Sequence, residues 1–275
     1  MKFKLLLLSF LICSNGWAAV DFDVTDDFIN MGSSGSWESD SSGTISAWIY
    51  ADTFTAGNGV RVILGYGGDN VATPGILDFS IRKNSGVFTG ARFDITQASD
   101  TGGVVAGWYG STQLSEDTWY HVVFASSGTL WAIVVNGIDE TMAAWTDAGA
   151  EGNDGDWFSD SPASNSSTYI GAVKFDGTVQ GFFDGKIEEV SIWSSAIGVS
   201  NSNLLSASKL RKISCQIAPS TLRVSWPIDQ CADGTSCNSL IFNSICGQNV
   251  DFGTGDNGAN DTGLTGVAGE ILTYP

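Results

Sequence analysis

The side chains best able to do chemistry in this chain are its carboxylates. The 30 Asp and Glu residues outnumber the 12 Lys and Arg residues, and the formal net charge is −18. Because a field of that sign repels nucleic acids and anionic membranes, neither is expected as a partner. The same carboxylates are the ligands that a hard cation such as calcium prefers. A nucleophilic triad is not indicated, since the only histidine, His121, lies inside an apolar run and is interpreted as a structural residue.

Paired carboxylates would allow a different chemistry, the hydrolysis of a glycosidic bond. That reaction needs two carboxyl groups that flank the bond. Two side chains of one strand share a face only when a single residue separates them. Glu188 and Glu189 are adjacent and therefore point to opposite faces, and the run Phe93–Gln97 holds one acid. A catalytic pair is absent from these runs, so the chain is not expected to be an enzyme.

Two tryptophans, Trp145 and Trp157, are candidate ligand-binding residues. They lie just before and within residues 149–167, an acidic stretch long enough to be either functional or loosely ordered. An aromatic ring can stack on the C–H face of a sugar while neighbouring acids and amides bind the hydroxyl groups. Other tryptophans fit strand patterns and are interpreted as core residues, namely Trp48, Trp119, Trp131 and Trp193.

Residues 1–18 have the order of a secretory signal peptide. Two lysines form a basic start, residues 5–12 form an apolar run too short to span a bilayer, and small residues follow. Cleavage is expected after Ala18 or Ala19. Cys13 is not expected to carry a lipid, because the residue before it is large where a lipoprotein signal has a small one. The mature protein is therefore expected to be secreted, or held at the cell surface without inserting into the membrane.

The remaining cysteines all lie in the last quarter of the chain. An even number of cysteines in a secreted chain predicts disulfide bonds, and four cysteines allow three pairings that the sequence does not distinguish. A zinc site is the alternative, but the spacing lacks a C-x₂-C pair. The four residues are Cys215, Cys231, Cys237 and Cys246.

Residues 20–193 have the pattern of short strands separated by Gly, Asn, Ser and Asp. The run Thr44–Tyr50 alternates between two faces, and Asn136-Gly137 fits the two-residue type I′ turn of a hairpin. This punctuation predicts an all-β sandwich. Further strand-like runs are Arg61–Leu64, Ile76–Arg82, Val87–Ile95, Val104–Tyr109, Trp119–Ala125 and Leu130–Val135.

Four segments, in order along the chain, carry a family resemblance. They are Val20-Asp-Phe-Asp-Val-Thr-Asp-Asp-Phe28, Ser46-Ala-Trp-Ile49, Trp119-Tyr-His-Val-Val123 and Phe183-Asp-Gly-Lys-Ile-Glu-Glu-Val-Ser-Ile-Trp193. Together they resemble the strands of a laminin-G-like, concanavalin-A-like jellyroll over about residues 20–208. Val24 stands where that family usually has Gly, and Glu188 where it usually has Asp.

The resemblance implies an antiparallel jellyroll of two packed sheets and one structural calcium ion. The ion would join the first strand to the last through Asp21 or Asp23, Asp26 and Glu188. The alternative is an ordinary acidic turn with a solvated Glu188. Laminarinase-type glycoside hydrolases share the fold, but their Glu-x-Asp-x-x-Glu strand is missing here.

The C-terminal part of the chain differs in composition from the rest. Its best strand, within Leu222-Arg-Val-Ser-Trp-Pro-Ile-Asp229, resembles the opening strand of a second laminin-G-like unit. Too few residues follow for a second sandwich. We therefore expect a signal peptide at 1–18, a jellyroll domain at 19–208, and a disulfide-containing tail or truncated repeat at 209–275.

These observations predict a secreted, non-catalytic recognition module that binds an extracellular polysaccharide or surface glycan. Two alternatives remain. One is a structural or adhesion protein that binds another protein through a sheet face, and the other is a degenerate glycoside hydrolase.

Overall fold

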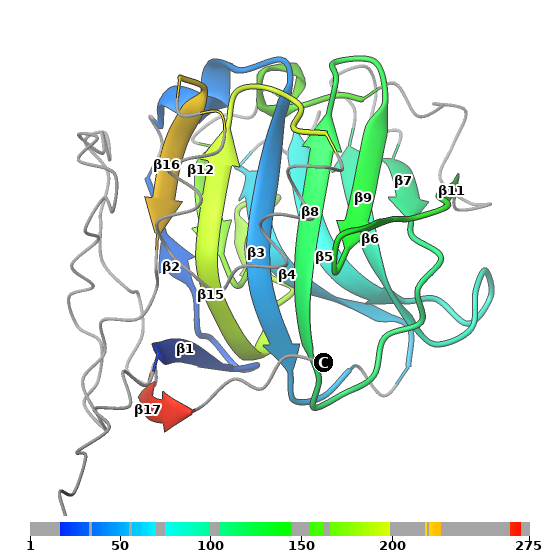
Figure 1. Cartoon of the computed structure of the whole chain (residues 1–275), viewed down its shortest axis with the longest axis vertical. Helices are drawn as coiled ribbons and strands as arrows, with labels where there is room; N and C mark the ends of the chain where they lie inside the picture. Colours follow the sequence, from blue (N-terminus) through cyan, green and yellow to red (C-terminus); the bar gives the residue numbers. More distant parts are fainter. Residues whose placement is uncertain are drawn as a thin grey trace, which may run out of the picture.

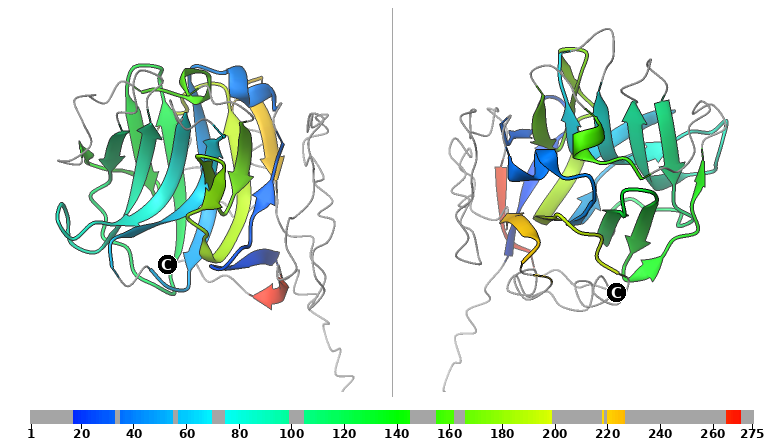
Figure 2. Two further views of the ribbon diagram at one scale, coloured as in Figure 1. Left: turned by 180° about the vertical axis from the view of Figure 1, so that it is seen from behind. Right: turned by 90° about the horizontal axis from the view of Figure 1, so that it is seen from above.

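Two antiparallel β-sheets pack face to face and form a jellyroll sandwich (Figure 1). The predicted all-β fold class is therefore confirmed. In this computed structural model the described residues are 17–32, 35–54, 57–69, 75–98, 105–144, 155–161, 166–198, 218, 220–226 and 265–270. The layers can be followed from behind and from above in Figure 2.

Sheet A has eight strands in the order β10-β9-β8-β3-β15-β1-β17, and β16 also pairs with β15. Its strands are β1 (Trp17–Asp23), β3 (Gly43–Ala51), β8 (Trp119–Ser126), β9 (Trp131–Val135), β10 (Ile138–Asp139), β15 (Asp184–Trp193), β16 (Leu222–Trp226) and β17 (Thr265–Glu270).

Sheet B has seven strands in the order β11-β7-β6-β5-β4-β12-β2. Its strands are β2 (Ile29–Asn30), β4 (Gly59–Gly67), β5 (Ile76–Lys83), β6 (Ala91–Ala98), β7 (Val105–Tyr109), β11 (Ala143–Ala144) and β12 (Ser167–Ile170). Separate from both sheets are a hairpin of β13 (Val173–Phe175) and β14 (Thr178–Gln180), and the 3₁₀-helices η1 (Ser36–Ser39) and η2 (Phe158–Asp160).

The core lies between the sheets and is built from alternate residues of their strands. Ile45 and Ile49 of β3 point inward beside Phe124 of β8, and Phe79 of β5 meets them from sheet B. The rings of Phe79 and Phe124 have centroids 5.2 Å apart. Because side chains alternate between the two faces of a strand, one face of each sheet packs in the core and the other faces outward.

The predicted hairpin is present where the sequence placed it. Val135 of β9 pairs with Ile138 of β10. Asn136 and Gly137 between them have φ angles of 49° and 81°. Positive φ at both central positions is what a type I′ turn requires, and Asn and Gly tolerate it best. The predicted strand Val87–Ile95 begins later than expected, because residues 84–90 form a turn before β6.

Strand β16 belongs to sheet A, although the sequence suggested that it opens a separate unit. Residues 190–193 of β15 pair with β16, and residues 184–187 of β15 pair with β1. The two strands follow one another along the same side of β15, as Figure 1 shows. Of the rest of the predicted tail, the structure describes residues 218 and 220–221 and strand β17, which pairs with β1 in the same sheet. Its four cysteines lie outside the described residues.

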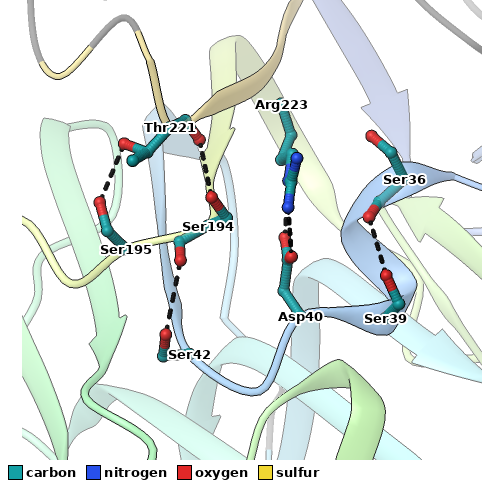
Figure 3. Close-up of polar contacts among 8 residues, drawn as sticks. All are labelled: Ser36, Ser39, Asp40, Ser42, Ser194, Ser195, Thr221 and Arg223. Atoms are coloured by element: carbon teal, nitrogen blue, oxygen red, sulfur yellow. Dashed lines mark hydrogen bonds and ion pairs between the residues drawn. The ribbon is translucent and has the colours of Figure 1, made fainter.

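Polar contacts attach β16 to the adjacent turns (Figure 3). Arg223 donates to both carboxylate oxygens of Asp40, at 2.9 and 2.6 Å. The carbonyl of Thr221 accepts from Ser194, and the Thr221 hydroxyl accepts from Ser195 at 2.9 Å. A strand distant in sequence is thereby joined to the sandwich by side chains as well as by its backbone.

Within the described residues, no helix combines the length and hydrophobicity needed to cross a membrane. The predicted signal peptide lies almost entirely before residue 17, the first of the described residues.

Candidate functional site

Trp157, which was predicted to contact a ligand, is a core residue. It immediately precedes η2, and its side chain is fully buried. Its ring centroid lies 5.3 Å from that of Phe79 and 5.4 Å from that of Phe158. Gly43 leaves room for the indole, since a side chain there would collide with it. Because no face of the ring is open to solvent, the prediction that Trp157 stacks on a ligand is wrong. Trp145 lies outside the described residues.

Two of the three residues predicted to bind calcium lie together in the turn after β1. Carboxylate oxygens of Asp23, Asp26 and Asp27 lie within 4.8 Å of one another. Asp27 is buried and accepts a hydrogen bond of 2.9 Å from the backbone N–H of Asp23. Three carboxylates around one point form a donor set that suits a hard cation.

Glu188 is not part of this acidic group, so its assignment as a ligand is corrected. The pairing of β1 with β15 places Asp184 opposite Asp23. Glu188 lies further along β15, opposite Trp48 of β3, and its side chain is almost fully buried. The assignment followed from the family resemblance, whereas strand register decides which residues of β15 reach the turn.

His121 is structural, as predicted. It faces outward from β8, opposite Trp48, with 5.0 Å between the ring centroids. The side chain is only 2% exposed, and burial lowers its pKa from 6.5 to about 3. The imidazole is therefore neutral at physiological pH and is shielded from any ligand in solution.

The outer face of sheet B carries a network of polar side chains. On β5, the Ser80 hydroxyl lies 2.9 Å from a carboxylate oxygen of Asp78 and 2.5 Å from one of Asp94 on β6. Arg82 donates to the other oxygen of Asp94 at 3.0 Å and to the hydroxyl of Thr96 at 2.9 Å. The two carboxyl groups thus share one hydroxyl, and the guanidinium forms its ion pair with Asp94.

Asp78 and Asp94 form a pair that the sequence alone did not reveal. Burial and the neighbouring charge of Asp94 raise the pKa of Asp78 to about 7, against the opposing effect of Arg82. Asp78 is 3% exposed and Asp94 is fully buried. A pair of carboxyl groups with unequal surroundings is the arrangement used for acid–base catalysis, but these two are covered. Alternation of polar residues along Asp78–Arg82 and Arg92–Thr96 is the signal that could have found them.

A groove of about 610 Å³ runs beside strand β9 at the edge of sheet A. One wall is the outward side of β9, where Ala132 is exposed and Val134 is buried. Trp108 of β7 and Met142 also line the groove, and both pack against the core. Figure 1 shows β9, β7 and β11 on one side of the sandwich. The groove therefore lies where the edges of the two sheets approach each other.

The groove combines apolar and hydrogen-bonding groups. Trp108 and Met142 offer partly exposed apolar surface, whereas Ser127, Asp139 and Glu140 offer oxygen atoms. A long polar chain with apolar C–H faces, such as a polysaccharide, could use both kinds of group. The sequence suggested the position of Trp108 near a strand end, but it could not show which residues of β9 would face it.

A comparison with protein families matches residues 23–201 to the concanavalin A-like lectin/glucanases superfamily. No curated protein sequence matches the chain.

Solved structures of similar fold share little sequence with the chain. The CBM40 of the Ruminococcus gnavus IT-sialidase is 12% identical, with a TM-score of 0.52, and the match covers 70% of this chain and 98% of that one. Tailspike protein 2 of the Escherichia coli O157:H7 bacteriophage CAB120 is 13% identical, with a TM-score of 0.50 and coverages of 76% and 26%. A candidate carbohydrate binding protein from Bacteroides ovatus ATCC 8483 is 19% identical, with a TM-score of 0.47 and coverages of 81% and 54%. The chain thus spans about half of that last protein's length.

Proposed function

This chain belongs to the concanavalin A-like lectin/glucanases superfamily, and we propose that it is a carbohydrate-binding module that acts outside the cell. The observation that carries the proposal is the groove beside β9, which is lined by Trp108 and by oxygen-bearing side chains. The likeness in fold to a module named for carbohydrate binding agrees with it. The order of residues 1–18, which resembles that of a signal peptide, supports the proposal that the protein is exported.

The dimensions of the groove favour a polysaccharide over a small metabolite. Its volume of about 610 Å³ is within the range of pockets that hold drug-sized ligands, but it lies open along a strand edge. A pocket for a small metabolite would enclose most of the ligand. An open groove can accept part of a longer sugar chain, with a sugar ring beside Trp108.

The proposed role is recognition without catalysis. Hydrolysis would require two carboxyl groups on either side of a bound glycosidic bond. Asp139 and Glu140, the acids of the groove, are neighbours on one wall. Asp78 and Asp94 are close to each other, but they are buried in sheet B and do not line the groove. Neither pair flanks a position where a sugar chain could lie.

We further propose that calcium binds the turn formed by Asp23, Asp26 and Asp27. The turn lies at the end of β1, next to the start of β15. An ion there would hold the first strand of the sandwich and stabilise the fold. Its position is distant in sheet order from β9, so it would support the fold and leave the groove as the ligand site.

Binding of another protein is a second candidate function. Leu130, which lines the groove just before β9, is 59% exposed, and Ile138 of β10, which pairs with the last residue of β9, is 69% exposed. Exposed apolar side chains around a groove are a feature of protein-binding surfaces. The Leu130→Ser, Ile138→Ser double variant separates the two functions. If it loses binding to a protein partner and still binds glycan, the two activities use different surfaces.

The test is a glycan array probed with the mature protein, followed by titration calorimetry. Ala132→Tyr places a ring in the groove from an exposed position, so it blocks the groove without altering the core. Thr178→Tyr, on the exposed hairpin β13–β14, is the matched control. We expect the first variant to lose at least about tenfold in affinity and the second to bind like the parent. Equal binding by both variants would place the ligand elsewhere, and an array without any bound glycan would reject the function.

A further inference from the structure

The Glu140 carboxylate is fixed in the wall of the groove. Its Oε2 atom accepts from the Ser111 hydroxyl at 3.1 Å and from the Thr112 backbone N–H. Its Oε1 atom accepts from the Thr112 hydroxyl at 2.7 Å. Gly110 makes room for this contact, because a Cβ atom there would lie 2.9 Å from Oε2. A carboxylate held by three donors cannot rotate away when a ligand approaches.

Among the described residues that line the groove, none carries a positive charge that could compensate Glu140. Among the described lining residues there is no Lys, Arg or His, whereas Asp139 adds a second, exposed carboxylate. Arg92 reaches the same turn, where it donates to the carbonyl of Ser111, but it does not line the groove. The net charge of −18 adds a repulsive background at longer range.

We propose that the groove selects uncharged polysaccharides and excludes polyuronates and sialylated glycans. This inference depends on the proposed carbohydrate-binding function and specifies its ligand. A sugar carboxylate placed in the groove would meet the negative charge of Glu140, which is held in place in a wall whose described residues carry no cation. A neutral sugar hydroxyl can instead donate to the exposed carboxylate of Asp139. The fixed acid therefore opposes acidic chains, while the exposed acid supplies an acceptor for neutral ones.

The size of the discrimination follows from Coulomb's law. Two like charges about 5 Å apart at a partly solvated site repel by roughly the energy that corresponds to a tenfold change in affinity. Glu140→Gln should therefore reduce the preference for a neutral over an acidic polymer by about tenfold. Much of the repulsion should disappear at high ionic strength, because salt screens partly exposed charges.

The experiment compares pairs of polymers that differ only in charge. The full mature protein is titrated with polygalacturonate and with alginate, each alongside its carboxyl-reduced derivative, and with a panel of neutral glucans, xylans and mannans. Measurements at low and high salt use the parent, Glu140→Gln, Asp139→Asn and the control Glu116→Gln. Glu116 is an exposed acid whose carboxylate accepts the Phe54 N–H, and Gln keeps that acceptor. Asp139→Asn provides an exposed variant in case Glu140→Gln is less stable.

The outcomes separate this inference from the proposed function. We expect neutral or carboxyl-reduced polymers to bind at least about tenfold more tightly than their acidic parents. This difference in affinity between neutral and acidic polymers should become smaller in Glu140→Gln or Asp139→Asn and should persist in Glu116→Gln. If acidic polymers bind equally well or better, and Ala132→Tyr abolishes that binding, the specificity is overturned while the function stands. If no polymer binds, the function itself fails and the specificity fails with it.

Discussion

Replacing Asp78 by Asn should stabilise the protein, and the gain should grow as the pH rises from about 4 to about 8. Asp78 lies on the outer face of sheet B with 3% of its surface exposed. Burial and the nearby Asp94 carboxylate raise its pKa from 3.8 to about 7. The guanidinium of Arg82 pairs with Asp94 at 3.0 Å, so its charge compensates Asp94 more directly than Asp78. Asn keeps an oxygen acceptor for Ser80 without introducing a charge.

The sign and the size of the change in stability follow from the linkage between protonation of Asp78 and folding. Because the pKa is higher in the folded than in the unfolded protein, protonated Asp78 favours the folded state. That contribution is fully present below about pH 4 and is lost as the pH rises through about 7. A rise in the pKa from 3.8 to about 7 corresponds to a destabilisation of roughly 4 kcal/mol when the group is fully ionised. The variant should therefore be a few kcal/mol more stable than the parent near pH 8 and similar to it near pH 4.

Urea unfolding of both proteins at several pH values measures this difference. Asp139→Asn, which removes an exposed carboxylate from a strand, is the matched control. The reasoning is refuted if the difference in unfolding free energy between Asp78→Asn and the parent changes by less than about 1 kcal/mol from pH 4 to pH 8. In that case Asp78 would keep its charge in the folded state at little cost, which would mean that water or a cation reaches it.

Three further predictions concern other parts of the molecule. Millimolar calcium should raise the melting temperature relative to EDTA, by an amount equivalent to about 2.7 kcal/mol at a hundred times the dissociation constant, and Asp26→Asn should abolish the shift while Glu188→Gln retains it. In a double-mutant cycle with Asp40→Ala and Arg223→Ala, urea unfolding should give a coupling energy of about 1 kcal/mol or less, since 36% of the Arg223 side chain is exposed; a coupling of zero would mean that the backbone pairing of β16 alone attaches it. As the pH falls from about 6.5 to about 4, the stability of His121→Gln should decrease less than that of the parent. In this range the imidazole of the unfolded parent gains a proton, whereas the buried His121 of the folded parent stays neutral. Identical pH curves would show that the imidazole is not buried in solution.

The strands and their faces could be predicted from the sequence because alternation is a local property. Thr44–Tyr50 was expected to alternate, and in β3 Ile45 and Ile49 are core residues while Trp48 faces outward. The type I′ turn was predictable for the same reason, since Asn136 and Gly137 determine it through their own backbone preferences.

The candidate site could be predicted only in part, because it depends on contacts between distant strands. Trp157 was expected at the surface, since its segment lacks a strand pattern. It is buried because Gly43, more than a hundred residues earlier, leaves space for its ring. Glu188 was expected beside Asp26, but it lies four residues along β15 from Asp184, the residue opposite Asp23, and is therefore away from the turn. Pairing and register determine these positions, and neither can be read from single segments.

Strand β16 shows how local and distant information combine. Its sequence correctly predicted a strand at Leu222–Trp226, yet the segment lies beyond residues 23–201, which match the superfamily. β1 covers only one half of β15. Without β16, residues 190–193 would form a sheet edge on that side, although residues 191–193 would still pair with β3 on the other side. An exposed edge of that kind invites pairing with another chain. The buried hydroxyls of Ser191 and Ser225, 2.8 Å apart, add a specific contact to this pairing. The folded unit therefore includes β16, and a shortened chain that ends at residue 201 should expose an edge and associate with itself.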